Sequence, residues 1–189
     1  MIEAMKPKLI VLNGPLGSGK STLAQKYAEG HPVTLNLDID NVWSTISHWR
    51  EQKEITGPLS KKLAVSMARI VLSEGHDVVV PQILQTEELA NSFQTLADEC
   101  NADYFEILLD VPKEESIKRF VARGKAHGHP SGFRAGGIID TSGRETKLAE
   151  MHDNMTAVAS NRLHVIKLEP ILNDVDATYS SLLQILNQE

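Results

Sequence analysis

Residues 14–21 read Gly14-Pro15-Leu16-Gly17-Ser18-Gly19-Lys20-Ser21, which fits the pattern G-x-x-x-x-G-K-[ST]. The apolar run LIVLN at 9–13 precedes this stretch, and a helical pattern over about 19–29 follows it. Glycines let backbone N–H groups curve around a phosphate, and the helix directs its positive end at the anion. In this pattern the lysine reaches the β/γ-phosphates and the following hydroxyl binds Mg²⁺. The stretch therefore predicts a site for a nucleoside triphosphate with Mg²⁺, using Lys20 and Ser21.

The motif also occurs by chance as a glycine-rich turn with an exposed lysine, but a strand before it and a helix after it favour phosphate binding. The chain has no N-K-x-D motif for reading guanine, which argues against a GTPase. The later apolar run Val78-Val79-Val80-Pro81-Gln82 ends without an aspartate, so the acidic pair of motor-type ATPases is missing. Another carboxylate must therefore assist Ser21 in holding Mg²⁺.

Strand-like and helical patterns alternate along the whole chain. Continuous apolar strands separated by helices are typical of an α/β fold with a parallel sheet. We expect a single domain over 1–189, with a glycine-rich lid over about 124–143. A break at Thr56-Gly57-Pro58 is expected to separate two helices. The expected strands are 9–13, 33–37, 77–84, 104–110 and 163–168, and the expected helices are 19–29, 39–50, 59–74, 87–99, 112–123, 144–159 and 175–187.

Composition limits the function classes. The 189 residues are 41% hydrophobic and 23% charged, which is typical of a globular chain and not of a disordered one. A net charge of −6 makes nucleic acid a possible but not a favoured partner. The single cysteine fits a reducing compartment, and neither an apolar run of about 18 residues nor a signal-peptide pattern is present, so we expect a cytoplasmic protein without a membrane contact.

Two aspartates follow the second expected strand, in Leu37-Asp38-Ile39-Asp40-Asn41. The carboxyl ends of parallel strands face the ligand in such sheets. A kinase needs a carboxylate there to accept the proton of an acceptor hydroxyl. Either aspartate could instead cap the helix that starts near residue 41. The pair favours a functional role, and which of the two is the base stays open at this point.

These segments together carry a family resemblance. GPLGSGKST, then LDIDN, then KRFVAR before a glycine-rich segment resembles the small P-loop kinases. This group includes adenylate, gluconate, shikimate and adenylylsulfate kinases, chloramphenicol phosphotransferase and the polynucleotide kinase domain. The resemblance implies a three-layer P-loop NTPase fold with five parallel strands in the order 2-3-1-4-5 and a lid. It also implies ATP and Mg²⁺ as cofactors and the γ-phosphoryl group as the group transferred.

The resemblance assigns roles to particular residues. The nucleotide would lie on Gly14, Pro15, Leu16, Gly17, Ser18, Gly19, Lys20, Ser21, Thr22 and Arg119. Asp40 would be the general base, while Asp38 would assist either Ser21 with the metal ion or the acceptor. Lys20, Arg123 and Arg134 would neutralise the phosphoryl group during transfer. The loop before the last helix, 169–174, would lie near the adenine ring.

One departure bears on the acceptor. Adenylylsulfate and polynucleotide kinases carry an arginine two residues after the position of Asn41, where this chain has Trp43. That difference argues against an acceptor that bears phosphate or sulfate. Trp43 could stack on a flat acceptor or pack in a core.

We therefore expect an ATP-dependent kinase that phosphorylates a hydroxyl of a small-molecule acceptor, as a monomer or a homodimer. A polynucleotide or nucleotide kinase is the first alternative, although five basic and five acidic residues over 36–75 give no basic groove. An ATP-binding regulatory or toxin-like protein is the second. Over 113–147 the chain has eight Lys/Arg against four Asp/Glu, so positive charge gathers where a triphosphate would need it.

Overall fold

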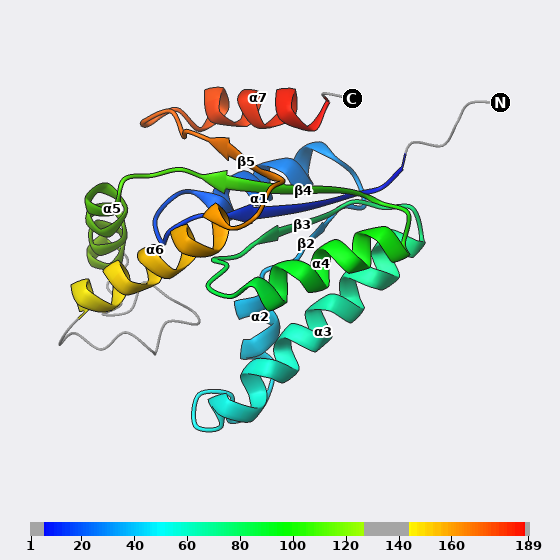
Figure 1. Cartoon of the computed structure of the whole chain (residues 1–189), viewed down its shortest axis with the longest axis horizontal. Helices are drawn as coiled ribbons and strands as arrows, with labels where there is room; N and C mark the ends of the chain where they lie inside the picture. The colour runs from blue at the N-terminus through cyan, green and yellow to red at the C-terminus, as the bar shows by residue number, and fades with distance from the viewer. Residues whose placement is uncertain (1–5, 127–143, 188–189) are drawn as a thin grey trace.

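The computed structural model describes residues 6–126 and 144–187, with side chains described for 6–122 and 145–187. Five parallel strands form one sheet in the order β2-β3-β1-β4-β5, which confirms the expected topology (Figure 1). Its strands are β1 (Lys8–Asn13), β2 (Leu35–Asn36), β3 (Val78–Pro81), β4 (Asp103–Leu109) and β5 (Val165–Leu168).

Helices cover both faces of this sheet and make three layers (Figure 1). Helices α1 and α7 pack on one face, while α3 and α4 pack on the other. The helices are α1 (Lys20–Gly30), α2 (Ile39–Ser44), α3 (Lys53–Ser73), α4 (Glu87–Glu99), α5 (Lys113–Ala126), α6 (Arg144–Ser160) and α7 (Val175–Leu186).

The central strand β1 contributes side chains to the apolar clusters on both faces of the sheet. Leu9 and Val11 belong to the apolar cluster under α3 and α4, and Ile10 and Leu12 belong to the cluster under α1 and α7. Successive side chains of a strand point to opposite faces, so a strand buried on both sides is apolar throughout. The phosphate-loop motif therefore follows directly on the central strand, which is buried on both faces of the sheet.

The expected break at Thr56-Gly57-Pro58 is wrong. Helix α3 runs through these residues, from Lys53 to Ser73, and the helix expected over 39–50 ends at Ser44. Pro58 is exposed in the second turn of α3, where the carbonyl that it leaves without an intrahelical donor is that of exposed Glu54. Water can bind that carbonyl, so the helix tolerates the proline.

Smaller differences concern the ends of elements. The strand expected over 33–37 shortens to Leu35–Asn36, because Val33 has a left-handed φ of +66° that no strand accommodates. Gly75 has the expected left-handed conformation after α3, with φ +82°. Helix α5 continues to Ala126, three residues beyond its expected end, and residues 127–143 of the expected lid lie outside the described residues.

Within residues 6–126 and 144–187, none of the helices combines the length and the apolar character that crossing a bilayer requires.

Candidate active site

The phosphate-loop residues Gly14–Ser21 connect β1 to α1 at the carboxyl end of the sheet. The preceding residue, Asn13, is fully buried. Its Oδ1 accepts hydrogen bonds from the backbone N–H of Gly14 at 2.8 Å and of Leu84 at 3.0 Å. The side chain thereby fixes the start of the loop to the segment that follows β3.

Two glycines give the loop its shape. Gly17 has φ +85°, and a Cβ there would lie 2.8 Å from the backbone oxygen of Ser116, so the loop lies directly against α5. Gly19 has φ +97° and caps α1, with no atom within 4 Å of the place where a Cβ would be. The backbone at the start of α1 is therefore open to a ligand, as anion binding at a helix N-terminus requires.

Lys20 lies inside the loop rather than in solvent, with 8% of its surface exposed. Its Nζ donates to the backbone oxygens of Gly14 at 2.7 Å and Pro15 at 2.9 Å. Ser21 and Thr22 follow on the exposed side of the first turn of α1. The loop therefore gathers an ammonium group, two hydroxyls and a helix N-terminus, which together suit the binding of a polyphosphate.

Asp38 caps α2. Its Oδ1 accepts from the backbone N–H of Asp40 at 2.9 Å and of Asn41 at 3.4 Å. The sequence left open whether Asp38 caps a helix or has a functional role, and the structure shows that it caps α2. The cap uses only Oδ1, so Oδ2 lies outside these two bonds and is the oxygen with which Asp38 could also serve a metal ion.

Asp40 is half-buried in the first turn of α2. Burial and the neighbouring charge of Asp38 raise its pKa to about 6, while the positive charge of Lys20 acts in the opposite direction. Asp40 is thus a carboxyl group within electrostatic reach of the phosphate loop, with a pKa close to the range in which a general base works.

Trp43 packs in the interior, 8% exposed. Its Nε1 donates to Oγ1 of Thr56 at 2.8 Å, and its ring meets that of Trp49 edge to face at 4.7 Å between centroids. The hydrogen bond joins α2 to α3, and the ring contact joins α2 to the segment between the two helices. The sequence left open whether Trp43 stacks on a flat acceptor or packs in a core, and these contacts favour packing.

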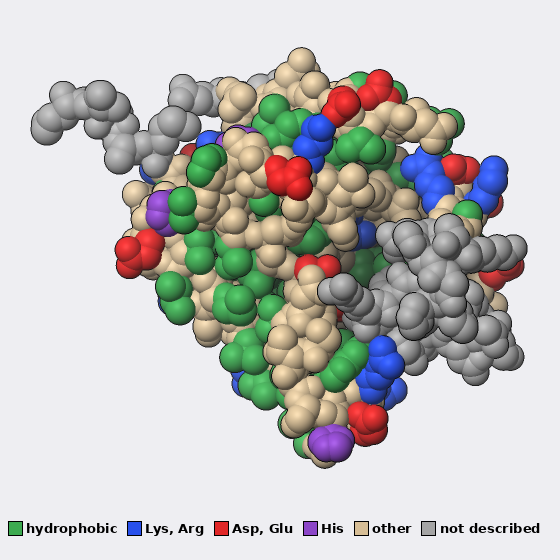
Figure 2. Space-filling view, turned by 180° about the vertical axis from the view of Figure 1, so that it is seen from behind, with side chains coloured by type: hydrophobic (Ala, Val, Ile, Leu, Met, Phe, Trp, Pro, Cys, Tyr) green, Lys and Arg blue, Asp and Glu red, His purple; other side chains and the backbone are tan. Residues whose placement is uncertain are grey.

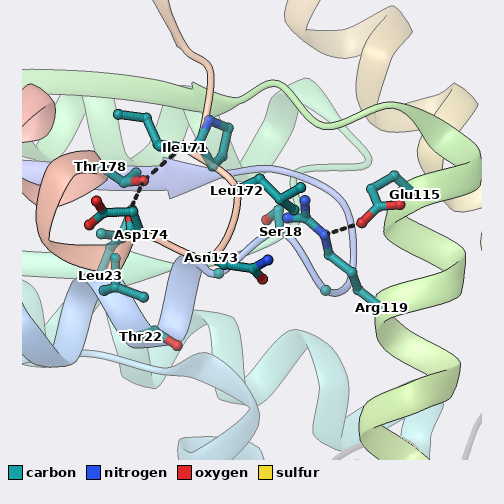
Figure 3. Close-up of a pocket in the computed structure, with 14 residues that line it drawn as sticks. Ser18, Thr22, Leu23, Glu115, Arg119, Ile171, Leu172, Asn173, Asp174 and Thr178 are labelled. Atoms are coloured by element: carbon teal, nitrogen blue, oxygen red, sulfur yellow. Dashed lines mark hydrogen bonds and ion pairs between the residues drawn. The ribbon is translucent and has the colours of Figure 1, made fainter.

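A pocket of about 280 Å³ opens beside the phosphate loop (Figure 3). Figure 3 shows Arg119 reaching from α5 toward Ser18 and toward Leu172, which lies in the loop before α7. Arg119 Nε donates to Glu115 Oε1 at 2.7 Å. The lining residues are Gly17, Ser18, Gly19, Thr22, Leu23, Glu115, Arg119, Pro170, Ile171, Leu172, Asn173, Asp174, Val175 and Thr178.

The loop over 169–174 forms the apolar wall of this pocket. Ile171 and Leu172 are both well exposed on it. Asp174 caps α7 by accepting from the N–H of Ala177 at 2.8 Å, and Oγ1 of Thr178 accepts from the N–H of Ile171 at 2.9 Å. The wall is therefore held by α7, and its apolar surface beside a phosphate loop could receive a planar base.

Several expected site residues are brought together and others are not described. The residues from Gly14 to Thr22 lie in one loop and turn, and Arg119 lines the adjoining pocket. The side chain of Arg123, and Arg134 altogether, lie outside the described residues. The sequence reading missed Asn13 and Glu115. Glu115 stands four residues before Arg119 on one helix, and that spacing could have identified it, whereas the contacts of Asn13 depend on the sheet.

The strand order and the loop between β1 and α1 define a P-loop NTPase fold. Residues 9–136 match the model of the AAA domain family AAA_33. This match covers more than half of the chain, so the protein belongs to that family. No curated protein matches the sequence.

Solved structures share the fold at low sequence identity. A provisionally assigned kinase from Chloroflexus aurantiacus is 18% identical, with a TM-score of 0.64 over 96% of each chain. The APS kinase CysC of Mycobacterium tuberculosis, solved with AMPPNP and APS, is also 18% identical, with a TM-score of 0.58 over 97% of this chain and 99% of that one. Shikimate kinase from Acinetobacter baumannii, solved with shikimate, is 16% identical, with a TM-score of 0.58 over 97% and 94%.

Proposed function

We propose that this protein is an ATP-dependent kinase that transfers the γ-phosphoryl group to a hydroxyl of a small-molecule acceptor. The observation that carries the proposal is Asp40, a half-buried carboxyl whose pKa is raised to about 6 and which interacts with the charge of Lys20. A loop that only binds nucleotide needs a carboxylate for Mg²⁺, and we assign Asp38 to that role, which leaves Asp40 for the acceptor. A phosphotransferase needs one where the acceptor hydroxyl must lose its proton.

The nucleotide would occupy the loop and the adjoining pocket. Its phosphates would lie on the backbone of Gly14–Ser21 and the first turn of α1, including Thr22, with Lys20 and Arg119 as positive charges. Its base would lie against Ile171 and Leu172. The neighbouring structures support this placement, since the APS kinase CysC that shares the fold was solved with AMPPNP.

The residues present fit a magnesium ion. Mg²⁺ keeps several waters and takes only one or two protein groups beside the substrate phosphates. Ser21 is exposed at the first turn of α1, and Asp38 has a carboxylate oxygen outside its capping bonds. We assign these two residues to the ion. When bound, Mg²⁺ would supply charge neutralisation for the phosphates.

In the proposed reaction, the acceptor oxygen forms a bond to the γ-phosphorus while the bond from that phosphorus to the β–γ bridging oxygen breaks. ADP leaves, and Asp40 accepts the proton of the acceptor hydroxyl. Lys20, Arg123 and Arg134 are assigned to neutralise the charge of the phosphoryl group as it moves. Asp40 has to be ionised at the start of this step, so the working pH must lie above the pKa of that carboxyl.

A transfer screen with radiolabelled ATP tests the proposal. Sugars, nucleosides, antibiotics and 5′-hydroxyl oligonucleotides are offered as acceptors, and the labelled product is identified. The expected result is transfer to a small molecule. Transfer to the oligonucleotide alone would instead identify a polynucleotide kinase, and ATP binding without any transfer would favour a regulatory protein.

The variant Asp40→Asn separates binding from chemistry. It is expected to lose about 10²- to 10⁴-fold in transfer rate, the usual contribution of a general base, with ATP affinity kept. Asp98→Asn is the matched control, because it makes the same change on the exposed end of α4, and it should transfer at the normal rate. Full turnover by Asp40→Asn would show that Asp40 is not the base.

A further inference from the structure

Asn173 has a free amide group at the pocket beside the phosphate loop (Figure 3). Its apolar neighbours Ile171, Leu172 and Val175 are 49%, 61% and 45% exposed, and Figure 2 shows apolar side chains on the upper part of the molecule, where α7 lies. No described residue forms a hydrogen bond with the amide of Asn173. The group therefore keeps its donor Nδ2 and its acceptor Oδ1 for a ligand.

The loop that carries Asn173 is held in shape by other polar groups. Oγ1 of Thr178 accepts from the N–H of Ile171 at 2.9 Å and donates to the backbone oxygen of Asp174 at 2.9 Å. Oδ1 of Asp174 accepts from the N–H of Ala177 at 2.8 Å. These bonds fix the place of Asn173 without using its side chain.

The backbone conformation of Asn173 explains the residue type only in part. Its φ is +58°, at the third position of a turn in which the N–H of Asp174 donates to the backbone oxygen of Ile171 at 3.2 Å. Glycine adopts this left-handed conformation most freely, and asparagine is among the few other residues that tolerate it. The turn accepts either residue, and of the two only asparagine adds an amide to the pocket.

Adenine presents the groups that such an amide recognises. Its amino nitrogen N6 donates and its ring nitrogen N7 accepts, side by side on one edge, and an asparagine amide bonds to both at once. Guanine has the acceptor O6 beside N7, so the same amide can satisfy only one of these two atoms. An amide at this edge therefore distinguishes the two purines.

We propose that Asn173 selects adenine over guanine, with Oδ1 accepting from N6 of the base and Nδ2 donating to N7. This role rests on the proposed function, in which the base lies against Ile171 and Leu172. Asn173 directly follows Leu172, so its amide lies beside a base that packs on the leucine. The charged side chains that line the pocket from α5, Glu115 and Arg119, bond to each other at 2.7 Å, whereas within the described residues no such bond competes for Asn173.

Calorimetric titration of the full chain with nucleotide and Mg²⁺, without an acceptor, tests this role. The natural chain should bind ATP roughly 5- to 150-fold more tightly than GTP, the discrimination that one bidentate pair provides. Asn173→Gly should bind ATP and GTP about equally, because it keeps the left-handed turn and removes the amide.

Asn101→Gly is the matched control. Asn101 is also exposed and also has a left-handed φ, of +51°, in the turn between α4 and β4 at the opposite end of the sheet. The variant makes the same change in the same backbone conformation away from the pocket, so it should keep the full preference for ATP. An equal loss of preference in both variants would overturn the role of Asn173.

The analogue 7-deaza-ATP, in which a C–H group replaces N7, tests the bond from Nδ2 separately. It should bind more weakly than ATP to the natural chain and as tightly as ATP to Asn173→Gly. Asn173→Asp also tolerates the left-handed turn, but it replaces the donor with an acceptor that repels N7. This variant should therefore bind 7-deaza-ATP more tightly than ATP.

The outcomes separate this role from the kinase proposal. A natural chain that binds ATP and GTP equally, or prefers GTP, would overturn the role of Asn173 and leave the kinase proposal intact. So would an undiminished preference for ATP in Asn173→Gly, or equal binding of ATP and 7-deaza-ATP by the natural chain. A natural chain that binds neither ATP nor GTP would overturn both.

Discussion

At the scale of single residues, Asp40 has a consequence for stability as well as for chemistry. Its pKa in the folded protein is about 6, against an ordinary value of 3.8, with burial as the first cause and the charge of Asp38 as the second. Between these two values the folded protein binds more protons than the unfolded chain. Stability contributed by this group is therefore present at low pH and is lost as pH rises through about 6.

The variant Asp40→Asn should accordingly stabilise the protein at pH 7. We expect a gain of about 1–3 kcal/mol in the free energy of unfolding, measured with urea and without nucleotide, because no carboxylate has to be ionised while partly buried. The gain should disappear below about pH 4, where Asp40 is protonated in both states. The exposed Asp98→Asn should show neither effect. A variant that is less stable than the natural protein at pH 7 would contradict this account of the raised pKa.

At the scale of helices and strands, the sequence predicted α4 to the residue and failed on α3. Leu89, Phe93 and Leu96 of α4 repeat at helical spacing with mostly polar residues between them, and no glycine or proline interrupts them. In α3 the local signal of Gly57-Pro58 indicated a break, and packing outweighed it. The bond from Trp43 to Thr56 and the buried Ser60 hold the first turns of α3 in place, and these contacts were not visible in the sequence.

If packing holds α3 together across Pro58, then Pro58→Ala should stabilise the protein. Alanine restores the N–H that can bond to the carbonyl of Glu54, and it removes the ring that crowds the preceding turn. We expect a gain of about 1–2 kcal/mol in the free energy of unfolding, less than the roughly 3 kcal/mol of a fully interior proline, because the site is near the start of the helix. Urea denaturation followed by circular dichroism measures it.

The matched control is Pro112→Ala. Pro112 directly precedes α5, where the first N–H groups of a helix have no intrahelical acceptor, so alanine gains no bond there. It should leave the protein unchanged or slightly less stable. Equal gains from both variants would indicate that the effect arises in the unfolded chain and not in α3.

At the scale of the whole molecule, the structural features that could be predicted from the sequence are those that depend on local pattern. The sheet order was predicted correctly from two local features. One is the alternation of strands and helices, and the other is the resemblance of GPLGSGKST and LDIDN to small P-loop kinases. Contacts between distant segments were not predictable. Arg162, which precedes β5, donates from Nε to Glu106 of β4 at 2.7 Å, 56 residues away. It also donates from Nη1 to Oδ1 of Asn91 in α4 at 2.5 Å, 71 residues away. No spacing in the sequence indicates such a pair.

This pair joins three segments around a buried charge. Glu106 is 1% exposed, and Tyr104 also donates to it at 3.1 Å. We expect Arg162→Met to lower the free energy of unfolding by about 3–5 kcal/mol, because removing one partner of a buried ion pair leaves the other without compensation. Urea denaturation at pH 7 measures the loss. The exposed pair of Lys167 and Asp110 provides the control, since Lys167→Met should cost less than about 1 kcal/mol.

A double variant decides whether the loss comes from the uncompensated charge or from the arginine's own packing. If the charge of Glu106 is the cause, Glu106→Leu combined with Arg162→Met should recover most of the stability, because an apolar pair has nothing left to desolvate. If the double variant is as unstable as Arg162→Met alone, the cause is instead the loss of the bonds from Arg162 to Asn91 and Gln94. In that case Asn91→Leu should destabilise the natural protein but not Arg162→Met, since the bond would already be absent there.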